Sequence, residues 1–325
     1  MMILLTGGAG FIGSCFLKKL NDQGIDDIMI VDSFRNTDKW KNLIGKKFIE
    51  IIHKDELFSF LNFSDEIKSG LKFDAVIHLG ACTDTTEKNM NYLIENNYRF
   101  SVNLANYALG KNSRFIYASS AATYGDGEKG YSDNRIDGLK PMNAYGFSKH
   151  LFDMWIYNNG LENDVTGIKF FNVFGPNEYH KGKMASMVYK AYNQVKSTGK
   201  IKLFKSNSDK YADGEQKRDF VYVKDVVEVL WKILNNKKAK GILNLGSGKA
   251  RTWNSLANSV FSALDLNPNI EYIDMPDEIK DQYQNFTQAD IKKLKAKGCS
   301  VEFSSLEDNI NDYVRNYLTK SWKYY

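Results

Sequence analysis

The stretch that decides the fold is Thr6-Gly7-Gly8-Ala9-Gly10-Phe11-Ile12-Gly13. The apolar run before it, Met2 to Leu5, predicts a buried strand, and a helical pattern of apolar residues follows it at once. Glycines at such a strand-to-helix turn let the backbone bend sharply and approach a pyrophosphate, whose charge is favoured at the helix N-terminus. The stretch therefore predicts a dinucleotide-binding turn.

The context of this turn supports the prediction, because a glycine triple alone also occurs in ordinary tight turns. A second apolar run, Ile28 to Val31, predicts another strand and ends at Asp32. This acid follows the turn by roughly twenty residues, where dinucleotide-binding folds place the carboxylate that binds the ribose. By itself, Asp32 favours a free 2′-hydroxyl and hence NAD.

The first half of the chain alternates strand and helix patterns, which predicts a Rossmann-type α/β fold with a doubly wound parallel sheet. We expect further strands around 47–52 and at 75–79, 114–118 and 166–171, and helices over 92–109 and 144–158. Ligands of such sheets bind beyond the carboxyl ends of the strands. The glycine turn, Asp32, Gly80-Ala81 and Ser120 should therefore converge on one crevice.

After residue 176 the pattern becomes less regular. Helices are expected at 184–195, 226–234, 256–264 and 306–318, and the polar segment 206–216 is expected to be an exposed loop. This predicts a smaller, interleaved α/β substrate domain. We expect residues 1–171 plus about 218–247 to bind the dinucleotide, and 172–217 plus about 248–325 to bind the substrate.

Composition narrows the function classes. The 325 residues carry a net charge of +5 with no dense Lys/Arg block, which suits an anionic small molecule and argues against nucleic acid. We expect no membrane span and no signal peptide. Cys15, Cys82 and Cys299 are expected to be reduced, buried thiols of a cytoplasmic protein, and no metal site is expected.

A candidate catalytic set lies in Tyr145-Gly146-Phe147-Ser148-Lys149. Tyr145 and Lys149 are four residues apart and share one helix face. A free tyrosine has a pKa of about 10, but a neighbouring ammonium and an oxidised nicotinamide would favour the phenolate. Tyr145 could then take a proton from a substrate hydroxyl while Ser120 orients that hydroxyl. Alone, the pair also fits a helix with one buried Tyr and one solvated Lys.

With these residues in place, the chain resembles the extended short-chain dehydrogenases/reductases, the NAD-dependent epimerase/dehydratase family. It is most similar to their ADP-glycero-manno-heptose 6-epimerase branch. Beyond the glycine turn, the stretches that carry the resemblance are Glu95-Asn96-Asn97-Tyr98, Tyr117 to Gly125, Phe171 to Pro176, His180-Lys181-Gly182, Met184-Ala185-Ser186, Lys217 to Val223, and Phe286 to Asp290.

The resemblance implies epimerisation at C6″ of ADP-glycero-D-manno-heptose, for the heptose of the lipopolysaccharide core. A carbon that bears only a hydroxyl has no acidic C–H. Transient oxidation to a ketone by a tightly bound cofactor, followed by re-reduction from the other face, inverts it without net redox change. The resemblance assigns the acid/base roles on the two faces to Tyr145 and Lys181. Spacing alone would leave Lys181 an ordinary loop lysine.

The resemblance also implies binding positions and assembly. Lys39 and Lys54 suggest a 2′-phosphate, so NADP is expected, with NAD the alternative, and a ring-like homopentamer is implied. Cofactor positions are Gly7, Gly10, Phe11, Ile12, Gly13, Asp32, Ser33, Lys39, Lys54, Leu79, Gly80, Ala81, Cys82, Thr83, Asn96, Lys149, Val173 and Lys181. Substrate positions are Asn172, Lys183, Lys190, Phe204, Lys205, Ser206, Asn207, Arg218 and Tyr283.

The chain differs from the usual sequence of this branch in three places that the resemblance assigns to binding of the nucleotide. Lys183 replaces the usual Ser, Lys190 replaces the usual His, and Phe204 to Asn207 replaces Phe-Glu-Gly-Ser before a longer loop.

Three other functions are considered. A dehydratase on the same fold would carry an Asp-Glu pair after Ser120, where this chain has Ala121-Ala122. An epimerase that acts on a UDP- or GDP-hexose would be distinguished by residues of the second lobe, and in this chain those residues favour an ADP-heptose. If the protein were a non-catalytic NADP-binding sensor, the Tyr-Lys pair would be expected to be lost, whereas this chain has both Tyr145 and Lys149.

Overall fold

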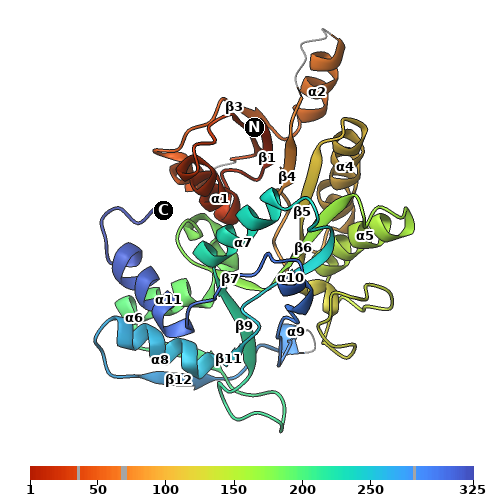
Figure 1. Ribbon diagram of the computed structural model, residues 1–325. Helices are drawn as coiled ribbons and strands as arrows, with labels where there is room; N and C mark the ends of the chain where they lie inside the picture. The colour runs from red at the N-terminus through yellow and green to blue at the C-terminus, as the bar shows by residue number, and fades with distance from the viewer. Residues whose placement is uncertain (35–36, 67–71, 281–282) are drawn as a thin grey trace.

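The computed structural model describes residues 1–34, 37–66, 72–280 and 283–325. Within these residues, seven parallel strands form the central sheet in the order β10-β6-β5-β4-β1-β2-β3 (Figure 1). These strands are β1 (Ile3–Thr6), β2 (Ile28–Asp32), β3 (Glu50–His53), β4 (Ala75–His78), β5 (Arg114–Ser120), β6 (Val165–Phe170) and β10 (Gly241–Leu245). The order extends outward from β1 in both directions, so the predicted doubly wound α/β fold is confirmed.

Helices cover both faces of this sheet (Figure 1). Ile3 and Leu5 of β1 share a core with α1 (Phe11–Asp22) and α7 (Val223–Asn235). Leu4, between them, belongs to the opposite core with α2 (Leu57–Glu66), α4 (Phe100–Gly110) and α5 (Ala144–Asn158). Successive strand residues point to opposite faces, so a strand that is buried on both sides is apolar throughout.

The predicted helix at 92–109 is present but not uniform. It consists of α3 (Met90–Leu93), the π-helical segment η2 (Ile94–Arg99) and α4 in succession. The π turn includes Asn97, whose buried amide bonds the backbone N–H and C=O of Cys82 at 2.8 and 3.0 Å. Its position therefore couples this helix to the loop after β4, on the crevice side of the sheet.

The remaining strands form two small sheets below the main one. They are β7 (Asn172–Phe174), β9 (Lys217–Tyr222) and β11 (Ala250–Thr252), in the order β11-β9-β7, and the parallel pair β8 (Ile201–Phe204) and β12 (Ile270–Ile273). The helices are α6 (Met187–Thr198), α8 (Trp253–Ala263), α9 (Asp277–Lys280), α10 (Lys292–Ala296) and α11 (Leu306–Tyr313). Short turns are η1 (Asp38–Leu43), η3 (Ala121–Tyr124), η4 (Tyr179–Met184) and η5 (Val314–Leu318).

Three details differ from the sequence-based expectations. Helix α6 begins at Met187, not 184, because the Ser186 hydroxyl caps it by accepting the Tyr189 N–H at 3.3 Å. Segment 206–216 is not exposed throughout, since Gln216 is buried and donates to the Lys205 carbonyl at 3.3 Å. Cys82 is half-buried rather than buried, because the loop after β4 faces a cavity.

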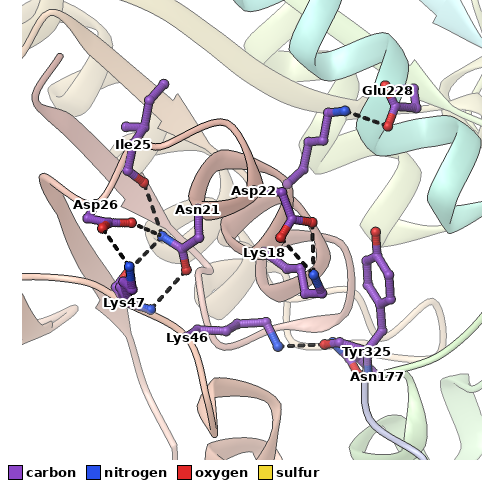
Figure 2. A network of polar contacts seen from close by, with 11 residues as sticks. Lys18, Asn21, Asp22, Ile25, Asp26, Lys46, Lys47, Asn177, Glu228 and Tyr325 are labelled. Carbon is purple, nitrogen blue, oxygen red and sulfur yellow. Dashed lines mark hydrogen bonds and ion pairs between the residues drawn. The ribbon is translucent and has the colours of Figure 1, made fainter.

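The C-terminal segment packs against the first helix (Figure 2). Lys46 donates to the Tyr325 carbonyl at 2.5 Å, and the Tyr325 N–H donates to the Asn177 side chain at 2.8 Å. Asn177 also donates to the Ser14 hydroxyl of α1 at 3.0 Å. Asn177 precedes η4, so this network fixes the base of the turn that carries Lys181.

Candidate active site

A cavity of about 1200 Å³ opens at the carboxyl ends of the parallel strands. Residues from β1, β2, β5, β6 and the loop after β4 line one part, and residues from η4, α6, β8 and β9 line the other. The predicted convergence of the glycine turn, Asp32, Gly80-Ala81 and Ser120 is confirmed, since all of them line this cavity.

The glycine turn is suited to close contact with a dinucleotide. Gly7 has φ +71°, and a Cβ there would lie 2.7 Å from the Gly80 nitrogen. A Cβ on Gly13 would lie 2.1 Å from the Gly7 oxygen, so the helix and strand could not approach as they do. Gly10 precedes α1 without any side-chain cap, which leaves the N–H groups of the first turn facing the cavity for a pyrophosphate.

Asp32 lies at the end of β2 beside a lysine. One carboxylate oxygen accepts a hydrogen bond from the Ala9 N–H at 2.9 Å, and the other accepts one from the Ser33 N–H at 2.7 Å. The second oxygen also forms an ion pair with the Lys39 ammonium. The acid is therefore hydrogen-bonded and neutralised on the side where a ribose would sit. Lys54 donates to the Asn96 amide oxygen at 2.8 Å at the same end of the cavity. These residues fit the adenosine half of a nicotinamide dinucleotide.

The candidate catalytic residues lie deeper in the cavity. Helix α5 begins at Ala144, where the Asn143 side chain accepts the Gly146 N–H at 2.7 Å. Tyr145, near the start of α5, and Ser120, at the end of β5, both line the cavity. Burial raises the pKa of Tyr145, whereas the Ser120 hydrogen bond lowers it in part. Burial thus opposes the phenolate, which makes the positive charges expected from Lys149 and an oxidised nicotinamide the more necessary.

Lys149 is buried one turn further along α5. Burial lowers its pKa to about 8, although the carboxylate of Asp153 acts in the opposite direction. A lysine with this pKa remains mostly charged at neutral pH. It can therefore bind ribose hydroxyls and provide a positive field beside Tyr145.

Lys181 reaches the cavity from η4. Its ammonium lies 5.9 Å from the Phe11 ring centroid, over the start of α1. Burial lowers the pKa of Lys181, and the buried Glu178 carboxylate partly offsets this shift. Glu178 is fixed by the Ser186 hydroxyl at 2.7 Å and by the Ser186 N–H. A lysine with a lowered pKa can exchange a proton more readily near neutral pH.

The far part of the cavity holds most of the expected substrate residues. The Arg218 guanidinium lies 5.0 Å from the Tyr283 ring centroid and 5.6 Å from the Trp253 ring centroid. Tyr283 in turn packs edge-on to Phe204. Asn172, Lys183 and Lys190 line the same space, and Lys190 donates to the Lys183 carbonyl at 2.7 Å.

Three expected substrate residues are not among those that line the cavity, namely Lys205, Ser206 and Asn207. After β8 the chain turns away: Lys205 pairs with Asp274 at 3.0 Å, and Asn207 donates to the Lys280 carbonyl at 3.2 Å. The Ser206 N–H donates to the Asp213 carboxylate at 2.7 Å.

Other lining residues escaped the sequence analysis, notably Glu178, Trp253 and Lys202. Glu178 lies two residues before the His180-Lys181-Gly182 motif, and this nearness to the motif is the one sequence signal that could have identified it. Trp253 and Lys202 lie in helix and strand patterns that carry no signal of a site.

The described residues include no cluster of three His, Cys, Asp or Glu side chains that could hold a metal ion. No helix in the described ranges is long and apolar enough to cross a bilayer.

Comparison with known proteins agrees with this geometry. Residues 3–246 match the NAD dependent epimerase/dehydratase family. The chain is 49% identical over 322 residues, 98% of each protein, to the ADP-L-glycero-D-manno-heptose-6-epimerase of Nitratidesulfovibrio vulgaris (strain DP4). It is 46% identical over 334 residues to the enzyme of that name from Fusobacterium nucleatum, covering 99% of this chain and 100% of the relative.

A solved structure gives the same result. The Helicobacter pylori ADP-L-glycero-D-manno-heptose-6-epimerase matches with a TM-score of 0.81 at 32% identity, covering 97% of this chain and 95% of that chain. The sequence relatives and this structure agree with the topology and with the family match over residues 3–246. The chain belongs to the NAD dependent epimerase/dehydratase family.

Proposed function

We propose that this protein is an ADP-glyceromanno-heptose 6-epimerase, which interconverts ADP-D-glycero-D-manno-heptose and ADP-L-glycero-D-manno-heptose at C6″. The observation that carries the proposal is that one cavity is lined by the dinucleotide turn, by Ser120 and Tyr145, and by Lys181. The names of relatives at 46–49% identity over nearly the whole chain support the substrate.

The reaction needs a hydride acceptor and acid/base groups. A nicotinamide dinucleotide, held by the glycine turn, Asp32 and Lys149, would supply the former, since its ring can take up a hydride and give it back. Tyr145 removes the proton from the C6″ hydroxyl, and Ser120 hydrogen-bonds that oxygen as its charge develops. The Lys149 ammonium stabilises the phenolate form of Tyr145. Lys181, from another element, provides the proton exchange for the second face.

The cofactor we propose is NADP, tightly bound, one per subunit. The support is the arrangement of Lys39 against Asp32, which offsets the negative charge that would otherwise repel a 2′-phosphate. Lys54, at the same end of the cavity, provides a second ammonium. NAD remains the alternative for the family as a whole.

Replacing both lysines by Ala tests this choice. We expect the Lys39→Ala/Lys54→Ala enzyme to weaken NADP binding by about 10²-fold, because each charge-assisted phosphate contact contributes about 1.5 kcal/mol. NAD binding should change by less than threefold. Calorimetric titration of the cofactor-free protein with each dinucleotide measures both constants, with Lys41→Ala as a surface control. Equal losses for the two cofactors would contradict a 2′-phosphate role.

Arg218 is proposed to bind the diphosphate of the sugar nucleotide. Its guanidinium is buried between two rings, and its planar fork suits paired phosphate oxygens. Arg218→Lys keeps the charge but loses the fork, so we expect KM for the ADP-heptose to rise about tenfold, with kcat within threefold. Arg251→Lys, at an ion pair of β11, is the matched control. A fall in kcat alone would argue against this assignment.

The direct test of function is incubation with ADP-D-glycero-D-manno-heptose, followed by analysis of the configuration at C6″. We expect an equilibrium mixture of the two epimers. No change at C6″, together with conversion of a UDP- or GDP-hexose, would favour the alternative epimerase. Stable NADP binding with no turnover of any nucleotide sugar would favour a sensor.

The setting we propose is the cytoplasmic supply of heptose for the lipopolysaccharide core. The division into a dinucleotide-binding part (1–171 plus about 218–247) and a substrate-binding part (172–217 plus about 248–325) belongs to this proposal. It also includes a homo-oligomer, with a pentamer implied by the resemblance and no nucleic-acid or membrane partner. Light scattering of the purified protein would measure the subunit number.

A further inference from the structure

A buried ion pair joins α5, the helix that carries Tyr145 and Lys149, to β6. The Asp153 and Lys169 side chains are both 0% exposed, and the Lys169 ammonium lies 3.0 Å from the Asp153 carboxylate. Removing two charges from water is costly, so such a pair persists only where further hydrogen bonds satisfy both groups. The mechanism above gives this pair no role.

Both groups have further partners. The Asp153 carboxylate accepts the Tyr117 hydroxyl at 3.0 Å and the Ser119 hydroxyl at 2.7 Å. Lys169 donates to the Thr123 hydroxyl at 2.5 Å, and its ammonium lies 4.7 Å from the Tyr124 ring centroid. The cluster therefore joins α5, β5, η3 and β6.

These are the elements that hold the catalytic side chains. Asp153 lies one turn after Lys149 and two turns after Tyr145 on α5, so the three residues share a helix face. Ser119, which donates to Asp153, immediately precedes Ser120 on β5. The Asp153–Ser119 hydrogen bond thus ties the strand that presents Ser120 to the helix that presents Tyr145.

We propose that Asp153 is a positioning residue of the epimerase. Its carboxylate holds α5 against β5 through the Ser119 and Tyr117 hydroxyls and provides a negative charge on the helix face that carries Lys149, while Lys169 forms an ion pair with that carboxylate. This inference rests on the proposed function, because the roles of Tyr145 and Lys149 do.

The charges around Lys149 make the sign of the effect clear. Asp153 raises the Lys149 pKa, so its removal should lower that pKa further. Lys169 neutralises Asp153, so its removal should raise the Lys149 pKa. The buried His78 of β4 faces Lys149, and burial lowers its pKa to about 3, so it stays neutral.

The other ionisable groups near α5 do not change this sign. On η2, Glu95 and Arg99 pair with each other at the surface at 3.2 Å. Burial is the largest effect on His150 and lowers its pKa, while Asp153 raises that pKa and Lys169 lowers it. His150 is therefore also neutral at neutral pH. Tyr117 on β5 and Tyr124 on η3 have pKa values raised by burial and remain protonated.

The experiment follows the ¹³Cε resonance of Lys149 in the full-length protein from pH 6 to 11, assigned by its loss in Lys149→Arg. The wild-type midpoint is expected near the pKa of about 8. Asp153→Asn should lower it by about one unit or more, and Lys169→Met should raise it. Asp164→Asn, an exposed acid before β6, should leave it unchanged. The double variant should lie between the two single variants.

A purely structural ion pair predicts a different result. Asp153→Asn and Lys169→Met would then both lower the melting temperature without moving the Lys149 midpoint, or would move it in the same direction. Either result overturns the proposal. If Asp153→Asn does not fold, Lys169→Met still decides, since an unchanged or lowered midpoint in that variant contradicts the inference.

Ser119→Ala tests the positioning separately from the charge. It keeps both ions, so the Lys149 midpoint should not move, while kcat should fall about three- to tenfold at unchanged KM because the Ser120–Tyr145 geometry loosens. An unchanged kcat would overturn the positioning role. If the wild-type protein fails to epimerise the ADP-heptose, the proposed function fails, whereas the titration still measures the Asp153–Lys149 coupling.

Discussion

Replacing Tyr145 by Phe is expected to lower kcat for epimerisation by about 10³-fold, within the range for loss of a general acid–base group. The substitution removes one oxygen and keeps the ring, so KM should change by less than threefold. Tyr157→Phe is the matched control, because Tyr157 lies on the same helix and is 51% exposed. Turnover of Tyr145→Phe within twofold of wild type would contradict the catalytic role.

The pH dependence provides a second readout for Tyr145. Burial raises its pKa, so the phenolate is scarce at neutral pH and kcat should increase with pH on the acid side of the profile. The Ser120 hydrogen bond lowers that pKa, so Ser120→Ala should raise it and shift the acid limb to higher pH. An acid limb that stays in place would mean that Tyr145 does not limit this side of the profile.

The residues around the cofactor turn were predictable because motif and topology coincide there. Gly7 directly follows a buried strand, Asp32 and Ser120 each end one, and parallel strands bring their carboxyl ends to one edge. Their positions at the strand ends are therefore enough to predict one crevice, and all three line the cavity. The family was likewise evident from local motifs such as His180-Lys181-Gly182, and the match over residues 3–246 confirms it.

The substrate part was less predictable because it depends on contacts between distant segments. Lys205 follows Phe204 directly, yet its side chain turns to Asp274, 69 residues later in the chain. Trp253 contributes to the Arg218 environment from the start of α8, which the periodicity described only as a helix. Such cross-chain pairings leave no periodic or spacing signal.

The pKa directions also required the structure, because burial decides them. From the sequence, two positive charges, a neighbouring ammonium and an oxidised nicotinamide, are expected to favour the Tyr145 phenolate; the structure adds burial, which raises the pKa of Tyr145. Burial likewise brings the Lys149 pKa to about 8 despite the carboxylate on the same helix face. Residue type and spacing define which charges are close, whereas desolvation depends on the whole fold around them.

Lys181 carries the second large effect. Lys181→Met is expected to lower kcat about 10²- to 10³-fold, because the long apolar side chain keeps the contact with Phe11 but exchanges no proton. Lys196→Met, an exposed lysine on α6, is the control and should leave kcat unchanged. Glu178 holds up the Lys181 pKa, so Glu178→Gln should lower that pKa and shift the corresponding limb of the profile to lower pH.

Single-turnover measurements from each epimer separately can distinguish proton transfer from binding by Lys181. If Tyr145 and Lys181 serve opposite faces, each variant should lose most of its oxidation rate with one epimer, and the affected epimer should differ between Tyr145→Phe and Lys181→Met. Absorbance at 340 nm follows this step directly. A Lys181→Met enzyme that oxidises both epimers at wild-type rates, with only a raised KM, would restrict Lys181 to binding. The two-face arrangement predicts complementary losses because Tyr145 and Lys181 come from different elements of the fold and each would serve the C6″ hydroxyl in one configuration.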